Sequence, residues 1–160
     1  MKTRIAAAAA ISVVTVGALW VWPGGRPAYG QDPAGSSGQL RSIWDGVYTK
    51  EQATRGDVAY QRQCASCHGA ALAGGEAAPP LAGGEFLSTW NGLTLGDLFE
   101  RIRISMPQDH PGKLSREQNA DILSYILSVN NFPVGKKELP HQTELLKEIR
   151  FEASKPDAKQ

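Results

Sequence analysis

The pentapeptide Cys64-Ala65-Ser66-Cys67-His68 contains both cysteines of the chain. In a helical turn, positions i, i+3 and i+4 share one face, so both sulfurs and the imidazole would point in the same direction. This arrangement suits covalent haem attachment, in which two thiols add to the porphyrin vinyl groups and the adjacent histidine ligates the iron. The motif therefore predicts one haem c, attached through Cys64 and Cys67, with His68 as an axial ligand.

Three other interpretations of the motif fit the surrounding sequence less well. A dithiol redox pair of this spacing is expected in a βαβ setting, and the neighbouring sequence indicates helix and loop. A zinc site would need a fourth ligand, for which the chain offers no second Cys or His pair. A disulfide across two residues would be strained and would leave His68 unexplained.

The candidates for the second axial ligand are Met106, His110 and His141, once Met1 is set aside as part of an export signal. Met106 is favoured because the chain between it and His68 is long enough to cross the ring, and Pro107 would hold the thioether in place. The alternative for an isolated methionine is a core filler. His110 is expected in a solvated turn and His141 in an exposed tail. A pair of histidine ligands would give a lower reduction potential than His/Met ligation.

Capping residues and apolar spacing predict an all-α fold. No strand pattern or internal repeat is evident, the region from Gly69 to Gly84 is too rich in glycine and proline for regular structure, and the last ten residues are expected to fray. Three to four core helices would then surround the haem, joined by long Gly/Pro-rich loops. The expected helices are 50–62, 95–105, 116–129 and a short one at 142–150.

The N-terminus is typical of a secretory signal. Lys2 and Arg4 precede an uncharged stretch from Ile5 to Trp22, and the small residues Ala28 and Gly30 suggest cleavage before Gln31. An uncleaved membrane anchor is the alternative, since the stretch is near the lower length limit for crossing a bilayer. The expected organisation is a signal at 1–30, a spacer and lead segment at 31–48, the haem domain at 49–132 and a C-terminal extension at 133–160.

Composition argues against nucleic acid as a partner. The chain has 160 residues, with 17 Lys plus Arg against 16 Asp plus Glu, and no long basic run. Cleavage would remove three of the basic residues and no acid, leaving 14 basic residues against 16 acidic ones. Such a mild charge predicts no strong long-range steering toward a partner.

With these residues in view, the sequence from 52 to 130 resembles the class I c-type cytochromes, which are small single-haem electron carriers. The resemblance rests on Cys64, Cys67 and His68, on Pro79-Pro80-Leu81, on Trp90, on Met106-Pro107 and on the final helix. It implies that a proline carbonyl accepts the second N–H of the axial histidine, with Pro79 as the first choice and Pro80 as the second.

The same resemblance implies that Trp90 lies near a haem propionate, where its indole N–H would be a suitable donor. The alternative is a core tryptophan without a polar role. The family also crosses its first and last helices at a small residue facing an aromatic one, and Gly56 and Tyr125 fit those positions.

A haem with two protein axial ligands is expected to exchange electrons and not to act as an enzyme. The lead segment 42–48 is similar to that of exported bacterial cytochromes related to the haem modules of quinoprotein dehydrogenases. This similarity implies a periplasmic carrier with such a dehydrogenase as donor and a terminal oxidase as acceptor. Two alternatives are a haem subunit of a membrane-associated dehydrogenase or oxidase complex, and a ligand-binding haem sensor. A membrane is expected as a partner only if the N-terminal segment is retained.

Overall fold

The computed structural model describes residues 40–156, which belong to one compact unit. The expected signal and the first part of the spacer lie outside the described residues. Among the residues described, no helix is long and apolar enough to cross a membrane. The regular elements, in chain order, are β1 (Arg41–Ser42), the 3₁₀ turn η1 (Ile43–Asp45), α1 (Lys50–Gln63), α2 (Ala65–His68), α3 (Gly84–Trp90), α4 (Leu95–Ser105), α5 (Arg116–Val129), α6 (Thr143–Lys147) and β2 (Ile149–Arg150).

Hydroxyl side chains begin the three long helices. Thr49, Thr94 and Ser115 each accept a hydrogen bond from the backbone N–H three residues later, and at Thr94 and Ser115 the third helical residue reaches back to complete a capping box. At Thr49 the third helical residue, Gln52, does not reach back. Its side-chain amide pairs with both backbone groups of Leu139, at 2.7 and 3.0 Å, because the C-terminal extension packs there.

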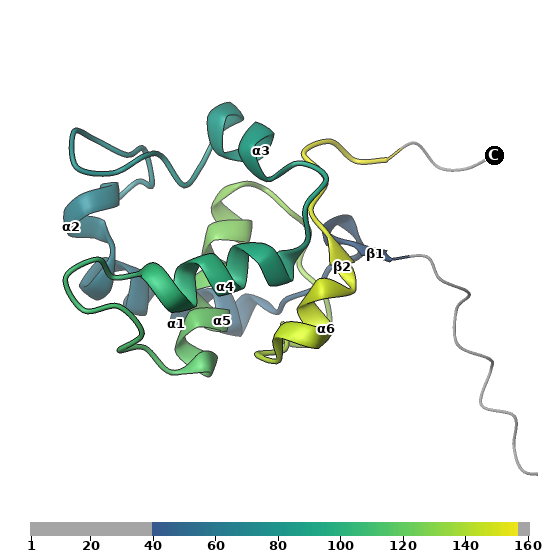
Figure 1. Ribbon diagram of the computed structural model, residues 1–160. Coiled ribbons are helices and arrows are strands. Elements are labelled where there is room, and N and C mark those ends of the chain that lie inside the picture. The colour runs from purple at the N-terminus through teal and green to yellow at the C-terminus, as the bar shows by residue number, and fades with distance from the viewer. Residues whose placement is uncertain (1–39, 157–160) are drawn as a thin grey trace, which may run out of the picture. The chain divides into compact units, whose positions relative to one another are not determined.

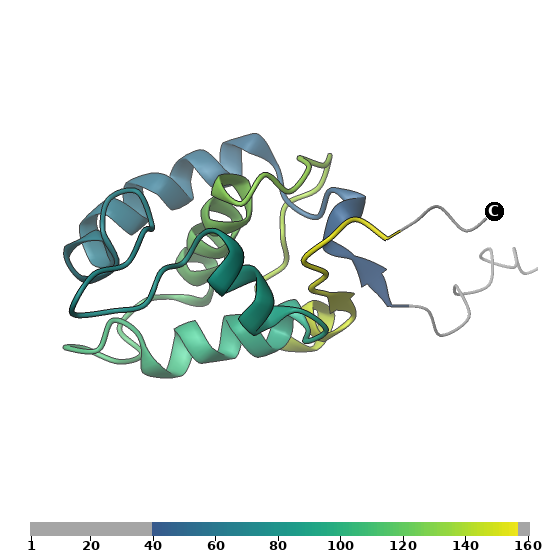
Figure 2. The same ribbon diagram turned by 90° about the horizontal axis from the view of Figure 1, so that it is seen from above.

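Helix α5 is the central element of the fold. It packs against both α1 and α4, which run on either side of it in Figure 2. The closest approach to α1 is at Gly56, where an added Cβ would lie only 1.9 Å from the Asp121 carbonyl oxygen and 2.9 Å from Cβ of Tyr125. The crossing of the first and last core helices at Gly56 and Tyr125 is therefore as expected, since only a glycine allows this backbone contact.

The C-terminal extension is more ordered than its sequence suggested. The expected helix at 142–150 is shorter, because residues 149 and 150 leave it to form a parallel strand pair with β1 (Figure 1). The expectation of no strand is therefore wrong, and so is the fraying expected to begin at Phe151, whose side chain is fully buried. Burial of an aromatic ring stabilises a segment with almost no helical periodicity of its own. Figures 1 and 2 both place this strand pair at the opposite end of the unit from α2.

Candidate functional site

The Cys64–His68 motif lies at the end of α1 and in the single turn of α2. The Cys64 N–H continues the helix by bonding to the Tyr60 carbonyl, and the Cys64 carbonyl accepts the N–H groups of Cys67 and His68. This helical turn brings both sulfurs and the imidazole to one cavity. Both thiols are free, with Cys64 half-buried and Cys67 exposed, and burial together with the nearby Cys67 raises the pKa of Cys64 to about 11.

The imidazole of His68 is held in one orientation by a backbone acceptor. His68 is 7% exposed, and its Nδ1 lies 2.8 Å from the carbonyl oxygen of Pro79. A carbonyl only accepts, so Nδ1 carries the proton and donates it, which leaves the lone pair of Nε2 free to bind a metal ion. Of the two prolines considered from sequence, Pro79 therefore makes the contact.

The loop that carries Pro79 folds back over α2 through glycines. Gly74 has φ +75°, and a Cβ on it would lie 2.5 Å from the Pro80 nitrogen. Its N–H donates to the His68 carbonyl at 2.9 Å, and the Leu81 N–H donates to Leu72 at 2.8 Å. A side chain at position 74 would push the proline segment away from the histidine, so this glycine is required for the His68 to Pro79 hydrogen bond.

Met106 ends α4 and lines the same cavity as His68. Its backbone is extended, with φ −124° and ψ 151°, and the following Pro107 is buried. His110 and His141 do not line the cavity, so within residues 40–156 only one histidine and one methionine face it. His110 has a 67% exposed side chain beside Asp109, as expected of a solvated turn.

Most of the remaining wall residues are apolar, although Arg62, Glu85, Arg101, Asp109 and Lys113 also line the cavity. Leu81, Leu98, Ile102, Ile122 and Ile126 contribute aliphatic side chains. Trp90 lines the cavity from α3, and within the described residues its indole N–H donates no hydrogen bond to the protein. Sequence reasoning did not anticipate Phe86, which lies one helical turn before Trp90 and also lines the cavity. Phe86 belongs to α3, a short helix flanked by glycines, so the sequence shows no apolar periodicity that would indicate a helix there.

The size and lining of this cavity fit a haem. Its volume is about 840 Å³, within the range of cofactor sites. It presents two thiols and an imidazole from one turn, a thioether from another element, and apolar walls between them. These residues would supply both thioether links and both axial ligands of a c-type haem.

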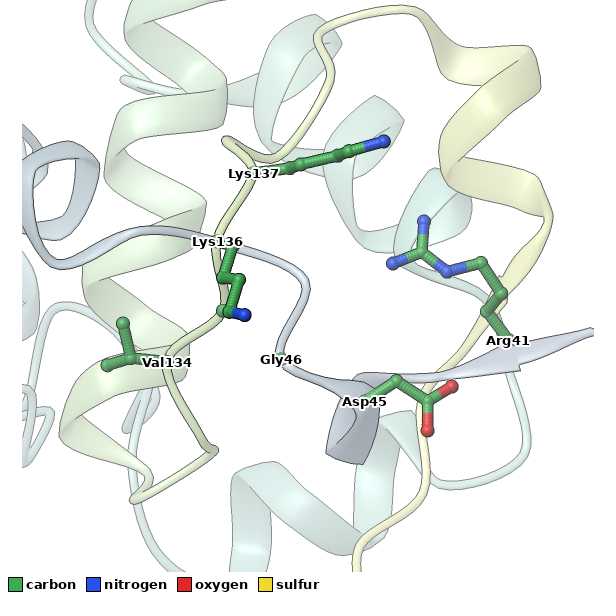
Figure 3. A pocket seen from close by; sticks show the side chains of 7 residues that line it. Arg41, Asp45, Gly46, Val134, Lys136 and Lys137 are labelled. Carbon is green, nitrogen blue, oxygen red and sulfur yellow. The ribbon is translucent and has the colours of Figure 1, made fainter.

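A second hollow lies near the strand pair and has a different character. It has a volume of about 520 Å³ and is lined by Arg41, Asp45, Lys136 and Lys137 together with Gly46, Val134 and Gly135. Figure 3 shows that the basic side chains come from two segments, β1 and the chain after α5. It contains no thiol, imidazole or thioether, so it is not suited to holding the iron.

Comparison with known proteins identifies the part of the chain that forms this site. Residues 51–126 match the family model described as cytochrome c oxidase, cbb3-type, subunit III. Among solved structures, the chain is similar to one in the crystal structure of the sulfane dehydrogenase SoxCD from Paracoccus pantotrophus, with 22% identity and a TM-score of 0.47. That match covers 79% of this chain and 66% of the other. A comparison with curated proteins gives no match.

The matched segment contains every residue that the sequence singled out for the haem site. Cys64, Cys67 and His68 lie near its beginning, Pro79 and Trp90 in its middle and Met106 toward its end. Residues 51–126 are therefore a cytochrome c domain, a haem-carrying electron-transfer unit whose cofactor is haem c.

Proposed function

We propose that the chain is a periplasmic single-haem electron carrier in which His68 and Met106 are the axial ligands. The observation that carries the proposal is the convergence of both side chains, with the two cysteines, on one cavity whose walls are mainly apolar. If His68 and Met106 both bind the iron, no coordination site would be left for substrate or oxygen. The bound haem supplies reversible one-electron exchange between ferric and ferrous iron.

The protein residues have separate roles in this proposal. Cys64 and Cys67 hold the cofactor, while the Pro79 carbonyl fixes the ring of His68 and raises its basicity as a ligand. Met106 supplies a soft thioether, which favours the reduced state and raises the potential. The aliphatic walls exclude water, which also favours the less charged reduced centre.

Trp90 is assigned the role of a donor to a propionate group of the haem. Support comes from its position in the cavity wall and from an indole N–H that has no acceptor among the described residues. A haem carboxylate is a suitable acceptor for such a donor.

Substitution of Met106 tests the ligation. In Met106→Ala the near-infrared sulfur-to-iron band of the oxidised protein should disappear and the reduction potential should fall, because the thioether is lost. The matched control is His110→Ala, which alters an exposed side chain four residues away and should leave the band unchanged. If the wild type lacked this band, and His110→Ala but not Met106→Ala changed its spectrum, the ligand would be His110 and not Met106.

Binding of an external ligand separates a carrier from a sensor. The ferrous wild-type protein should not bind carbon monoxide at neutral pH, whereas Met106→Ala should bind it through the freed position. Ready binding by the wild type would contradict stable Met106 ligation and would favour the ligand-binding haem sensor.

The cellular setting is assigned from the lead segment and the N-terminus. The similarity of residues 42–48 to exported dehydrogenase-linked cytochromes supports a quinoprotein dehydrogenase as donor and a terminal oxidase as acceptor. Weak docking is expected around Ala65, Ser66 and the glycine-rich loop, where small residues leave the thioether edge accessible. Mass spectrometry of the exported protein would find an N-terminus near Gln31 for a free carrier, and an intact N-terminal segment for an anchored subunit.

A further inference from the structure

The C-terminal strap, defined here as residues 149–153, lies beyond the segment that matches the family model. Its backbone is hydrogen-bonded to residues 91–94, which form the whole link between α3 and α4. The Phe151 carbonyl accepts the Gly92 N–H at 2.8 Å, and the Phe151 N–H donates to the Leu93 carbonyl at 2.8 Å. A third bond runs from the Ala153 N–H to the Asn91 side chain at 2.9 Å. The strap thus fixes the chain immediately after Trp90.

The side chain of Phe151 continues this contact into α3. Phe151 is fully buried and meets the ring of Phe86 edge-on, with centroids 5.9 Å apart and an interplanar angle of 82°. The Phe86 ring lies 6.5 Å from that of Trp90. Because Phe86 and Trp90 both line the haem cavity, a contiguous set of three rings joins the strap to the cofactor site.

The strap is held from its other side by the lead segment. The Glu152 carboxylate accepts a hydrogen bond from Ser42, and the Glu152 carbonyl accepts the indole N–H of Trp44 at 2.9 Å. Arg41 pairs with Ile149 in the parallel strand ladder. The strap therefore lies between the lead segment and α3 and has few ways to shift without breaking one of these contacts.

Helix α3 depends on such anchors. It has seven residues, begins after Gly83 without a side-chain cap, and makes at most slight contact with the other helices in the part of the chain described. A helix this short is unstable without tertiary contacts. At its start the Gly83 N–H donates to Asn130 at 3.0 Å, and its end is held by the strap. The position of α3 is therefore set from outside the helix.

From these contacts we infer that the strap raises the reduction potential of the haem. In this inference Phe151 acts as a positioning residue for Phe86 and Trp90. The inference rests on the proposed role of Trp90 at the cofactor. Loss of the Phe151 ring would let α3 move, weaken the contact of Trp90 with the haem carboxylate and admit water to the cavity. Hydration favours the more charged oxidised centre, so the reduction potential falls.

The test compares two buried apolar residues of the extension in the full-chain holoprotein. Phe151→Ala should lower the reduction potential and change the circular dichroism of the haem Soret band, which senses aromatic rings beside the porphyrin. Leu139→Ala is the matched control, since Leu139 is also buried in the extension but its backbone pairs with Gln52 near the start of α1, and neither residue lines the cavity. It should lower stability while leaving the potential and the Soret signal unchanged. Phe151→Leu keeps a large apolar side chain, so its reduction potential should lie close to that of the wild type.

A double-substitution cycle with Trp90→Phe identifies the route of the effect. If Phe151 acts through Trp90, the shift caused by Phe151→Ala should fall to less than half in the Trp90→Phe background. An equal shift in both backgrounds, or an equal shift from Leu139→Ala, would overturn the inference. If Trp90→Phe alone leaves the potential unchanged, the proposed role of Trp90 fails, which is a separate result from an ineffective Phe151→Ala.

A milder variant covers the case in which Phe151→Ala does not fold. Asn91→Ala removes only the hydrogen bond accepted from the Ala153 N–H, at an exposed position. It should shift the potential in the same direction and by a smaller amount. No shift in this folded variant would count against the strap as the element that holds the end of α3.

Discussion

At the scale of single residues, the two cysteines have different surroundings, although they are expected to do the same chemistry. Cys64 is half-buried between α1 and the cavity, whereas Cys67 is exposed. Each thioether removes one vinyl group from conjugation with the porphyrin. In Cys64→Ser or Cys67→Ser one vinyl group should therefore remain, and the α band of the pyridine haemochrome should move to longer wavelength. The double variant should contain no haem that resists acid extraction.

Ser66→Ala is the matched control for these variants, because it lies between the cysteines and changes neither of them. It should keep the spectrum and the acid resistance of the wild-type haem. Covalent retention of haem in the double variant would contradict attachment through Cys64 and Cys67, whatever the potential of that variant.

How far the site could be predicted depends on how local its chemistry is. Cys64, Cys67 and His68 lie within one helical turn, so sequence spacing alone was enough to bring them together. The choice between Pro79 and Pro80 required the three-dimensional path of the glycine loop, because the two prolines are adjacent and no local sequence pattern distinguishes their carbonyls. Phe86 could not be found from sequence, since its place in the cavity wall depends on the distant Phe151.

At the scale of helices, the contact between α1 and α5 depends on Gly56. An alanine there would place its Cβ 1.9 Å from the Asp121 carbonyl oxygen, so the two backbones would have to separate. Gly56→Ala should lower the free energy of unfolding by roughly 1–3 kcal/mol, the usual cost of overpacking a core. Urea denaturation followed by circular dichroism would measure this change.

Gly84→Ala provides the control for helix propensity. Gly84 begins α3, and an added Cβ there would meet no heavy atom within 4 Å. This variant should be unchanged or more stable, by up to about 1 kcal/mol, because alanine is the better helix former. If both variants were equally stable, the close approach of α1 and α5 would not be a real constraint.

The elements predicted correctly and those missed differ in where their stability comes from. α1, α4 and α5 carry capping residues, and α4 and α5 also carry apolar stripes, so local sequence signals predict them. α3 and β2 are short and have no such signals. Their order comes from tertiary contacts, chiefly those around Phe151, which no local pattern reveals.

At the scale of the whole molecule, Glu100 joins the extension to the helical core. Its carboxylate on α4 accepts hydrogen bonds from Arg103, at 2.6 Å for the closest pair, and from Thr143 on α6, and it lies 3.9 Å from Arg116 on α5. The hydrogen bond from Arg103, followed by that from Thr143, lowers the pKa of Glu100 from 4.5 to about 2. The ionised carboxylate therefore links side chains of three helices.

The sign of the resulting pH dependence follows from this lowered pKa. Because the folded state holds the proton less tightly than the unfolded state, Glu100 stabilises the fold fully above about pH 4.5 and loses this effect as the pH falls toward 2. The melting temperature of Glu100→Gln should thus lie below that of the wild type at neutral pH, and the difference should shrink steadily through this window.

Comparison of the two proteins at each pH removes the effects that they share. Glu144→Gln is the control, because Glu144 lies on α6 and makes no ion pair among the residues described. It should follow the wild type at every pH. A gap between wild type and Glu100→Gln that stayed constant from pH 7 to about pH 2 would show that the glutamine lowers stability through altered packing and not through the lost charge.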